Sequence, residues 1–258
     1  MIDKVKFAQK IPQLNGVYLI FSTATRCPYV VCNPETYDDE AIVCLTEGLA
    51  ANKVSELRSE DIPVSMTRIE KDAMLIFFTE MFGFGINAVR FIDLSGEICL
   101  QLEEFVKRND MSEVPEINRP LENPILQLSM LYFTQEVRCK NRDMRKIREL
   151  EEEMVVNIHK NTFLVPVMET GEVNEKGQKE IKFMVIRSQD KEPVVPVFTD
   201  TVTLSHFLGV NKTQVVKLNI EQLYQLEVPD ATRGYLFNPN SVGLVLNKDQ
   251  LARIIRDF

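Results

Sequence analysis

Short apolar segments alternate with amphipathic ones along the first hundred residues, which is typical of an α/β protein. Residues 16–22 and 28–32 are rich in β-branched and aromatic residues and predict strands. We expect a helix over 38–58, with acidic residues in its first turn and Arg58 near its end, where both suit the helix dipole. The other predicted elements are a strand at 62–69, a helix at 70–82, a strand at 87–93 and a helix at 96–107.

The second half of the chain begins with its longest helical pattern. Apolar residues recur at helical spacing from 123 to about 157, with an interruption at Lys140 and Asn141, so we expect a bent helix or two successive helices. Asp200 is a good N-cap for a short helix over 201–208. The predicted strands are 162–168, 181–187, 193–198, 214–218, 234–238 and 242–246, the first three antiparallel, with a charged hairpin connector at 169–180 and further helices at 220–227 and from Lys248.

A polar stretch with three prolines, residues 108–124, divides the chain. Proline fixes φ and removes a backbone donor, so such a stretch interrupts helix and sheet alike. We therefore predict an α/β (α+β) protein of two similar mixed-sheet modules, with helices packed on the sheets. The predicted boundaries are a first module over 1–108, a linker over 109–122, and a second module over 123–258 that begins with the long helix.

The two halves can be aligned with each other. Any two segments in which a strand is followed by a helix share a few identical residues by chance. The alignment therefore leaves open whether 1–108 is a divergent tandem copy of the second module. The aligned residues are Val64, Ile69, Glu70 and Leu75 with Val215, Ile220, Glu221 and Leu226 at one offset, then Asn87 and Val89 with Asn240 and Val242.

Composition and charge narrow the class of protein. Hydrophobic residues make up 45% and charged residues 26% of the chain, as in ordinary soluble globular proteins. No apolar run approaches the ~20 residues that span a bilayer, and the five cysteines do not form a disulfide framework. We expect a cytoplasmic protein that does not bind membranes. Up to residue 120 the chain has 12 Lys and Arg against 19 Asp and Glu, which disfavours nucleic-acid binding there.

The residue patterns that catalysis or metal binding requires are missing. Cys27 and Cys32 do not form a closely spaced pair, and neither His159 nor His206 has a partner histidine, so a zinc site is disfavoured. The sequence also lacks a G-x-S-x-G nucleophile motif. The acidic run 38–40 is interpreted as solubilising surface charge, because neighbouring residues on a helix diverge. We therefore expect no cofactor, no metal and no catalytic residue.

The turn Asn238-Pro239-Asn240 is the most distinctive polar feature. Asparagine bonds its own backbone and tolerates left-handed conformations, so a tight turn is the favoured interpretation. In the alternative interpretation, this turn and Phe198-Thr199-Asp200 lie at neighbouring strand ends, where open α/β sheets bind ligands. The candidate ligand- or partner-binding residues are Phe198, Asp200, Arg233, Asn238 and Asn240.

A basic block, residues 138–148, lies on the long helix and is followed by an acidic one. Such a helix could contact RNA. However, Arg148 and Glu152 are four residues apart and can pair along the helix surface, and aromatic residues do not alternate with the basic ones. A solvated helix face is favoured, and RNA binding is the weaker alternative.

The motifs of the second half follow one another in a particular order. Phe163-Leu-Val-Pro-Val comes first, Pro193 through Phe198-Thr-Asp200 then precedes a short helix, and Phe237-Asn-Pro-Asn and Gly243-Leu-Val-Leu follow. In this order and spacing, residues from about 123 to 258 resemble the SseB (enhanced serine sensitivity) family. The resemblance implies a bacterial, soluble α/β protein without an established molecular activity. It carries over no catalytic residue, because the family has no agreed active site.

We therefore expect a non-catalytic protein of the SseB type that acts as a protein-interaction or regulatory module, with an unidentified protein partner and self-association as a further option. The sequence leans against an enzyme without excluding one. The alternative is a small-molecule-binding or enzymatic domain with a site near the turns at 198–200 and 233–241. A well-formed pocket there would favour the alternative. A flat surface there, with an exposed apolar patch elsewhere, would favour the interaction module.

Overall fold

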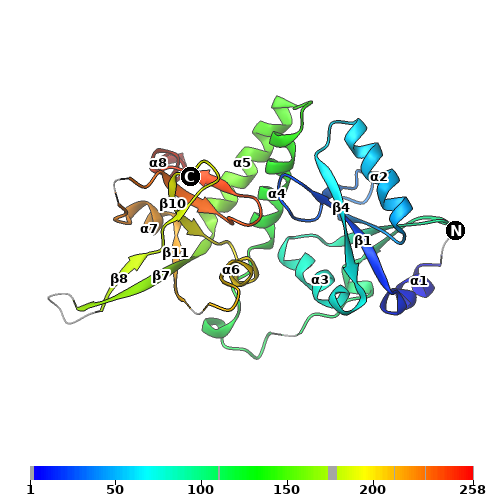
Figure 1. Ribbon diagram of the computed structural model, residues 1–258, viewed down its shortest axis with the longest axis horizontal. Coiled ribbons are helices and arrows are strands. Elements are labelled where there is room, and N and C mark those ends of the chain that lie inside the picture. Colours follow the sequence, from blue (N-terminus) through cyan, green and yellow to red (C-terminus); the bar gives the residue numbers. More distant parts are fainter. Residues whose placement is uncertain (1–2, 110, 174–178, 212, 230, 258) are drawn as a thin grey trace. The chain divides into compact units, whose positions relative to one another are not determined.

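The computed structural model forms two compact units, each of which combines a mixed β-structure with helices (Figure 1). It describes residues 3–109, 111–173, 179–211, 213–229 and 231–257. The first unit comprises residues 1–119 and 127–150, and the second comprises 120–126 and 151–258. The α/β class and the two mixed-sheet modules predicted from the sequence are confirmed. None of the described helices combines the length and apolar character that a membrane-spanning helix needs.

The first unit is built on a sheet with the strand order β4-β1-β3-β5-β6, to which β2 adds by pairing with β3. Strands β3 and β5 are parallel, and the other neighbours are antiparallel. The strands are β1 (Gly16–Ser22), β2 (Val30–Cys32), β3 (Asp39–Cys44), β4 (Val64–Glu70), β5 (Ala88–Asp93) and β6 (Gly96–Gln101). The helices of this unit are α1 (Lys4–Lys10), α2 (Glu47–Ser59), α3 (Lys71–Gly83), α4 (Pro124–Arg138) and the start of α5 (Met144–Lys160), with 3-10 turns η1 (Ile11–Gln13) and η2 (Leu102–Glu104).

Helices cover both faces of this sheet, α2 on one side and α3 on the other (Figure 1). Ile42 packs in a core cluster with Val54 and other residues of α2. Val43 follows Ile42 on β3, so its side chain points to the opposite face of the sheet. Phe91 lies beside Val43 on β5 and points to that same opposite face. There its ring meets Phe78 of α3, with 6.1 Å between the ring centroids. The central strands are therefore buried on both faces.

The second unit has a comparable β-structure. Strand β7 pairs with β8 and β11, while β10 pairs with β9 and β12, and β12 pairs with β13. Leu164 and Phe198 exchange backbone hydrogen bonds of 2.8 and 2.9 Å, which link β7 to β10. The strands are β7 (Thr162–Val173), β8 (Lys179–Phe183), β9 (Ile186–Arg187), β10 (Pro193–Val197), β11 (Gln214–Asn219), β12 (Gly234–Phe237) and β13 (Leu244–Leu246), and the helices are α6 (Thr201–Leu208), α7 (Ile220–Gln225) and α8 (Lys248–Asp257).

The two units share one connectivity. The order β4-β1-β3-β5-β6 of the first unit corresponds to β11-β7-β10-β12-β13 of the second, and β10 and β12 are parallel, as β3 and β5 are. In chain order, β4 lies between α2 and α3, and β11 likewise lies between α6 and α7. The aligned residues Val64 and Val215 lie on the corresponding strands β4 and β11. Asn87 precedes β5, whereas Asn240 follows β12, so that part of the alignment is wrong. Descent of the modules from one repeated unit stays a prediction.

Two helices predicted in the first half are wrong in part. Residues 39–44 form β3, and only 47–59 form α2, which Thr46 caps by accepting a hydrogen bond from the amide of Leu49. Residues 96–101 form β6 instead of a helix. For β3 the reason is burial, because a strand buried on both faces is a continuous apolar run without a period of two. For β6 the reason is the tight turn between Asp93 and Gly96, which folds the segment back onto β5 as an antiparallel edge strand.

The long helical pattern forms the successive helices α4 and α5, as the interruption at Lys140 and Asn141 predicted. The predicted strand 181–187 forms β8, which is antiparallel to β7, and β9, which is antiparallel to β10. Strand β10 meets β7 through an antiparallel bridge at Leu164, so the predicted antiparallel start is confirmed, although its strands lie in two ladders. The predicted charged connector at 169–180 lies partly outside the described residues, which resume at Lys179. Of the predicted linker, residues 116–118 form a 3-10 turn, η3 (Glu116–Asn118).

Helix α4 groups with the first unit because its side chains bond that sheet. The amide of Gln135 pairs with the backbone of Val30 in both directions, accepting from its N–H and donating to its C=O, each at 3.1 Å. The Tyr132 hydroxyl donates to the carboxylate of Asp39 at 2.6 Å. The predicted boundary placed this helix with the second module. That residues 1–108 and 123–258 fold as two separate domains stays a prediction.

Candidate functional site

The polar residues that follow β10 and β12 are brought together, as the sequence predicted for neighbouring strand ends. Because β10 and β12 are parallel, their carboxyl ends lie at one edge. Thr199 and Asp200 directly follow β10, and Asn238 directly follows β12. We call Thr199, Asp200, Thr203 and Asn238 the Asn238 cluster.

Side chains of the Asn238 cluster bond one another. The Asn238 amide accepts from the backbone N–H of Thr199 at 3.1 Å and donates to its hydroxyl at 2.9 Å. The Thr199 hydroxyl in turn donates to Asp200 at 2.8 Å. Asp200 also accepts from the backbone N–H of Thr203 at 2.8 Å and so caps helix α6, as predicted. Asn238 has φ +47°, a left-handed conformation that asparagine tolerates well.

The chemistry of this cluster is structural. Thr199, Asp200 and Asn238 are buried, and each bonds to a neighbour. Buried polar groups that satisfy one another make the fold more rigid. Asn123 extends the network, because its side-chain amide donates to the carbonyls of Thr162 and Thr199 at 2.8 and 2.7 Å. Asn123 was not predicted from the sequence, because its two partners lie 39 and 76 residues away.

The other candidate residues do not join the cluster. Phe198 is buried, and its ring packs against Phe207 with 5.0 Å between centroids. Arg233 is exposed and lies 3.6 Å from the carboxylate of Asp190. Asn240 is exposed in the turn. The five predicted residues therefore divide into buried fold-forming side chains and two separate surface side chains.

A second polar centre lies in the first sheet at Glu40. This residue is buried, so its interpretation as solubilising surface charge is wrong. Glu40 is on the central strand β3, and Arg90 lies near it on β5. Arg90 donates to one Glu40 oxygen through Nε at 2.6 Å and Nη2 at 2.5 Å, and the Asn33 amide donates to the other at 2.7 Å. Both carboxylate oxygens thus have strong donors.

Asp38, Glu40 and Cys99 place one potential metal-ligand atom each within 4.8 Å of one another. Two features oppose metal binding. The Arg90 guanidinium already neutralises Glu40, and it would repel a second cation. Burial, followed by a hydrogen bond to Glu40, raises the pKa of the Cys99 thiol to about 12, whereas a metal binds the thiolate. The group fits an internal ion pair better than a cation site.

Burial also raises the pKa of Cys44 to about 11, from an ordinary value of 9.0, and the pKa of Tyr29 and of Tyr235 to about 12. A group whose pKa is higher in the folded state stabilises the fold fully below its unfolded pKa, and this contribution is lost as the pH rises through the folded pKa. We expect the free energy of unfolding to decline from about pH 9 to about pH 12.

This decline can be measured by urea denaturation in reducing buffer at successive pH values. The variant Cys44→Ala/Cys99→Ala removes two of the groups and should show a shallower decline above pH 9, whatever its stability at pH 7. A wild-type profile that stays flat between pH 9 and pH 11 would contradict the expectation.

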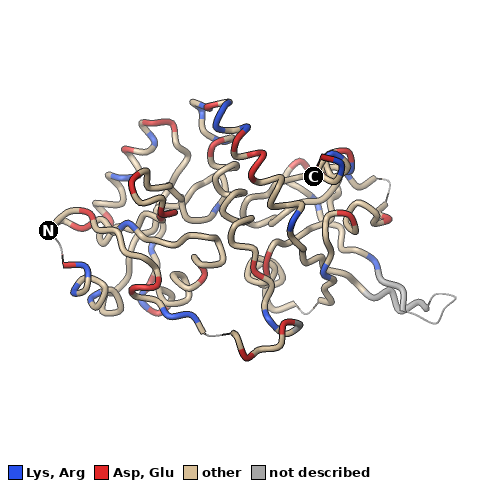
Figure 2. The backbone as a smooth tube through the Cα atoms, turned by 180° about the vertical axis from the view of Figure 1, so that it is seen from behind, with Lys and Arg blue, Asp and Glu red and all other residues tan. Residues whose placement is uncertain are grey.

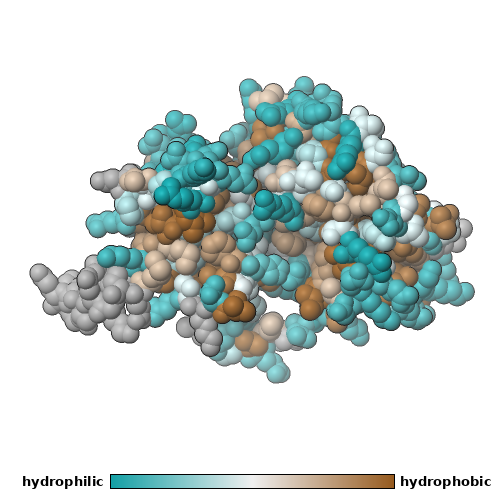
Figure 3. Space-filling model, viewed as in Figure 1, coloured by the Kyte–Doolittle hydropathy of each residue, from teal (hydrophilic) through white to brown (hydrophobic). Residues whose placement is uncertain are grey.

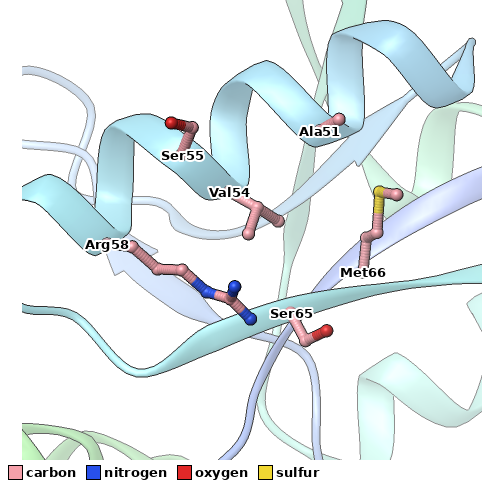
Figure 4. Close-up of a pocket in the computed structure, with 6 residues that line it drawn as sticks. All are labelled: Ala51, Val54, Ser55, Arg58, Ser65 and Met66. Carbon is pink, nitrogen blue, oxygen red and sulfur yellow. The ribbon is translucent and has the colours of Figure 1, made fainter.

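A surface pocket of about 380 Å³ lies in the first unit between helix α2 and strand β4 (Figure 4). Arg58 reaches from the end of α2 toward β4, where its Nε donates to the Val64 carbonyl at 2.9 Å. From the sequence, Arg58 was predicted only to suit the helix dipole; the pocket depends on the packing of α2 against β4, which the sequence does not show. Its lining residues are Ala51, Val54, Ser55, Arg58, Ser65 and Met66.

The second half of the chain is a mixed α/β unit with the buried Asn238 cluster at the carboxyl ends of β10 and β12. Residues 143–253 match the model of the SseB protein N-terminal domain. The match lies within residues 123–258 and confirms the resemblance to the SseB family that the sequence predicted for them. No curated protein sequence matches the chain.

Two solved structures are similar along most of the chain. "Tic22 from Plasmodium falciparum" is 13% identical and has a TM-score of 0.22, with 97% of this chain and 96% of that chain covered. "Anabaena Tic22 (protein transport)" is also 13% identical with a TM-score of 0.22, with 93% of each chain covered. At these scores neither structure supports an inference about this chain.

Proposed function

We propose that the protein is a non-catalytic protein-interaction module of the cytoplasm. The observation that carries this proposal is the outer face of helix α3. Leu75 and Ile76 are 65% and 63% exposed there. Several apolar side chains reach the surface in the view of Figure 3. The free state of all five cysteines fits a reducing compartment.

The composition of α3 explains why this face differs from an ordinary surface helix. The helix buries Met74, Phe78 and Met81 against the sheet. A helix that covers one face of a core normally has polar residues on the other side. Here Leu75 and Ile76 occupy that other side. Contiguous exposed apolar surface marks protein-binding sites, and we take Leu75 and Ile76 as the centre of such a surface.

The SseB-type domain supports the same proposal, because the resemblance carries no catalytic residue. The alternative of a small-molecule or enzymatic site near 198–200 and 233–241 lacks support from the geometry, since Asp200 and Asn238 are buried among their own hydrogen-bond partners.

RNA binding through 138–148 also lacks support. Basic residues at the start of α5 are followed directly by acidic ones (Figure 2). Lys140 lies 3.2 Å from Asp61, and Lys146 lies 2.7 Å from Glu136. Carboxylates of the same chain therefore already neutralise two of the basic residues in 138–148.

Affinity capture from source cells tests the proposal with the variant Leu75→Glu/Ile76→Glu. Both side chains are exposed, so the fold should survive the substitutions. An apolar partner that docks on α3 would bury the two new carboxylates, and the cost of burying them would oppose docking. We expect recovery of specific partners to fall by about tenfold or more. Leu94→Glu is the matched control, because Leu94 is an exposed leucine outside α3. Equal recovery with all three proteins, or turnover of a substrate by the purified protein, would count against the proposal.

A further inference from the structure

Strand β4 ends the sheet of the first unit, and among the described residues no strand pairs with its outer backbone edge. The direction of its backbone groups follows from two hydrogen bonds. The carbonyl of Pro63 accepts from Thr23 on the β1 side, whereas the carbonyl of Val64 accepts from Arg58 on the outer side. Backbone groups alternate in direction along an antiparallel strand. Met66 and Arg68 therefore direct their N–H and C=O groups outward as well.

The exposed edge is protected unevenly. Proteins commonly place charges on such edges to prevent the addition of another strand. In β4 the pair Arg68 and Glu70, 3.1 Å apart, occupies the end of the strand. The segment from Val64 to Met66 lacks such a pair among the described residues. It also borders the pocket under α2.

The pocket beside this open segment is mainly apolar. Figure 4 shows Met66 extending from β4 toward α2 and Val54 pointing from α2 into the space between them. Its volume of about 380 Å³ lies near the low end of the ~300–1,000 Å³ typical of small-molecule sites. An aliphatic side chain of an added strand would enter the pocket from the edge.

Arg58 supplies the charge of the site. Its Nε bonds the Val64 carbonyl, and its guanidinium has no ion-pair partner among the described residues. The neighbouring cations differ, since Lys53 lies 2.7 Å from Glu56 and Arg68 lies 3.1 Å from Glu70. A guanidinium without a carboxylate favours a ligand that brings one, and its planar donors suit bidentate binding.

We propose that β4 and the α2 pocket bind an extended acidic peptide segment of a partner protein by strand addition. The peptide backbone pairs with the outward groups of Met66 and Arg68. One apolar side chain fills the pocket, and a Glu or Asp two positions away binds Arg58, because alternate side chains of a strand share a face. This site is on the α2 face of the sheet and is independent of the apolar face of α3.

The test is fluorescence anisotropy with the full chain and a labelled octapeptide. The probe is N-acetylated and C-amidated, alternates Thr and Val, and carries Leu-Thr-Glu at its centre. We expect saturable binding that weakens by about tenfold with Arg58→Glu. A peptide with Lys in place of its Glu should recover affinity for Arg58→Glu. Ala51→Trp, which fills the pocket from an exposed position, should weaken binding independently. Arg253→Glu on α8 is the control and should bind as wild type does.

Four results would overturn the proposal, the last of them with a methylated peptide. The first is no saturable binding to the wild-type chain. The second is equal affinity for wild type and for Arg58→Glu. The third is binding only of peptides with a free C-terminal carboxylate, which would place a chain end on Arg58 instead of an acidic side chain. Methylation of the peptide amide nitrogens should abolish binding, and persistence of binding after methylation would exclude strand addition.

Discussion

Replacement of Arg90 by methionine should lower the free energy of unfolding by about 3–5 kcal/mol. Glu40 is fully buried, and two of its strong hydrogen bonds come from the Arg90 guanidinium. Without Arg90 the carboxylate would remain in the sheet interior, where Asn33 and the Cys99 thiol are its remaining donors among the described residues. Urea denaturation followed by far-UV circular dichroism at pH 7 measures the change.

Two further variants separate the ion pair from general damage to the sheet. The double variant Glu40→Met/Arg90→Met removes both charges and should recover most of the loss, because apolar residues can replace a buried pair at little cost. Arg68→Met removes an exposed pair on β4 and should cost less than about 1 kcal/mol. If Arg90→Met were as stable as Arg68→Met, the Glu40 centre would not stabilise the fold.

Replacement of Asn238 by alanine should lower the free energy of unfolding by about 2–4 kcal/mol. The variant would leave the buried N–H of Thr199 without its acceptor at the end of β10. It would also place alanine at φ +47°, where a side chain that cannot bond the backbone is strained. The same urea denaturation measures the loss.

Asn240 offers a matched control in the same turn. Its side chain is exposed, so Asn240→Ala should change stability by less than about 0.5 kcal/mol. Asn238→Gly should restore part of the stability, because glycine accepts the left-handed conformation but lacks the amide. Equal stability of Asn238→Ala and Asn240→Ala would show that the hydrogen bonds of the Asn238 cluster do not stabilise the fold.

The Asn238 cluster could be predicted in part because its members follow apolar runs directly. Asp200 before a short helix predicted a cap, and the turn at Asn238 predicted a left-handed residue; both occur. The mutual bonding of Thr199 and Asn238 could not be read from the sequence, since it depends on the parallel pairing of β10 with β12. Burial of the cluster decides its role, and burial depends on tertiary packing.

The Glu40 centre was missed for a related reason. Three successive acidic residues before an apolar run indicated the first turn of a helix, but Glu40 belongs to a central strand. Its partner Arg90 is fifty residues away in the sequence and comes near only through the β3–β5 register. The two hydrogen bonds between the Gln135 side-chain amide and the Val30 backbone depend in the same way on packing between residues far apart in the sequence. The local apolar pattern carries no information about such pairs.

The central claim is that the protein binds a partner through its exposed apolar surface and not through the turns that follow β10 and β12. Site-specific photo-crosslinking in source cells tests it, with p-benzoylphenylalanine placed at Ile76 in one variant and at Asn240 in another. Both positions are exposed, so the probe should not disturb the fold. We expect a discrete protein adduct from position 76 and none from position 240. An adduct from position 240 with none from position 76 would contradict the claim.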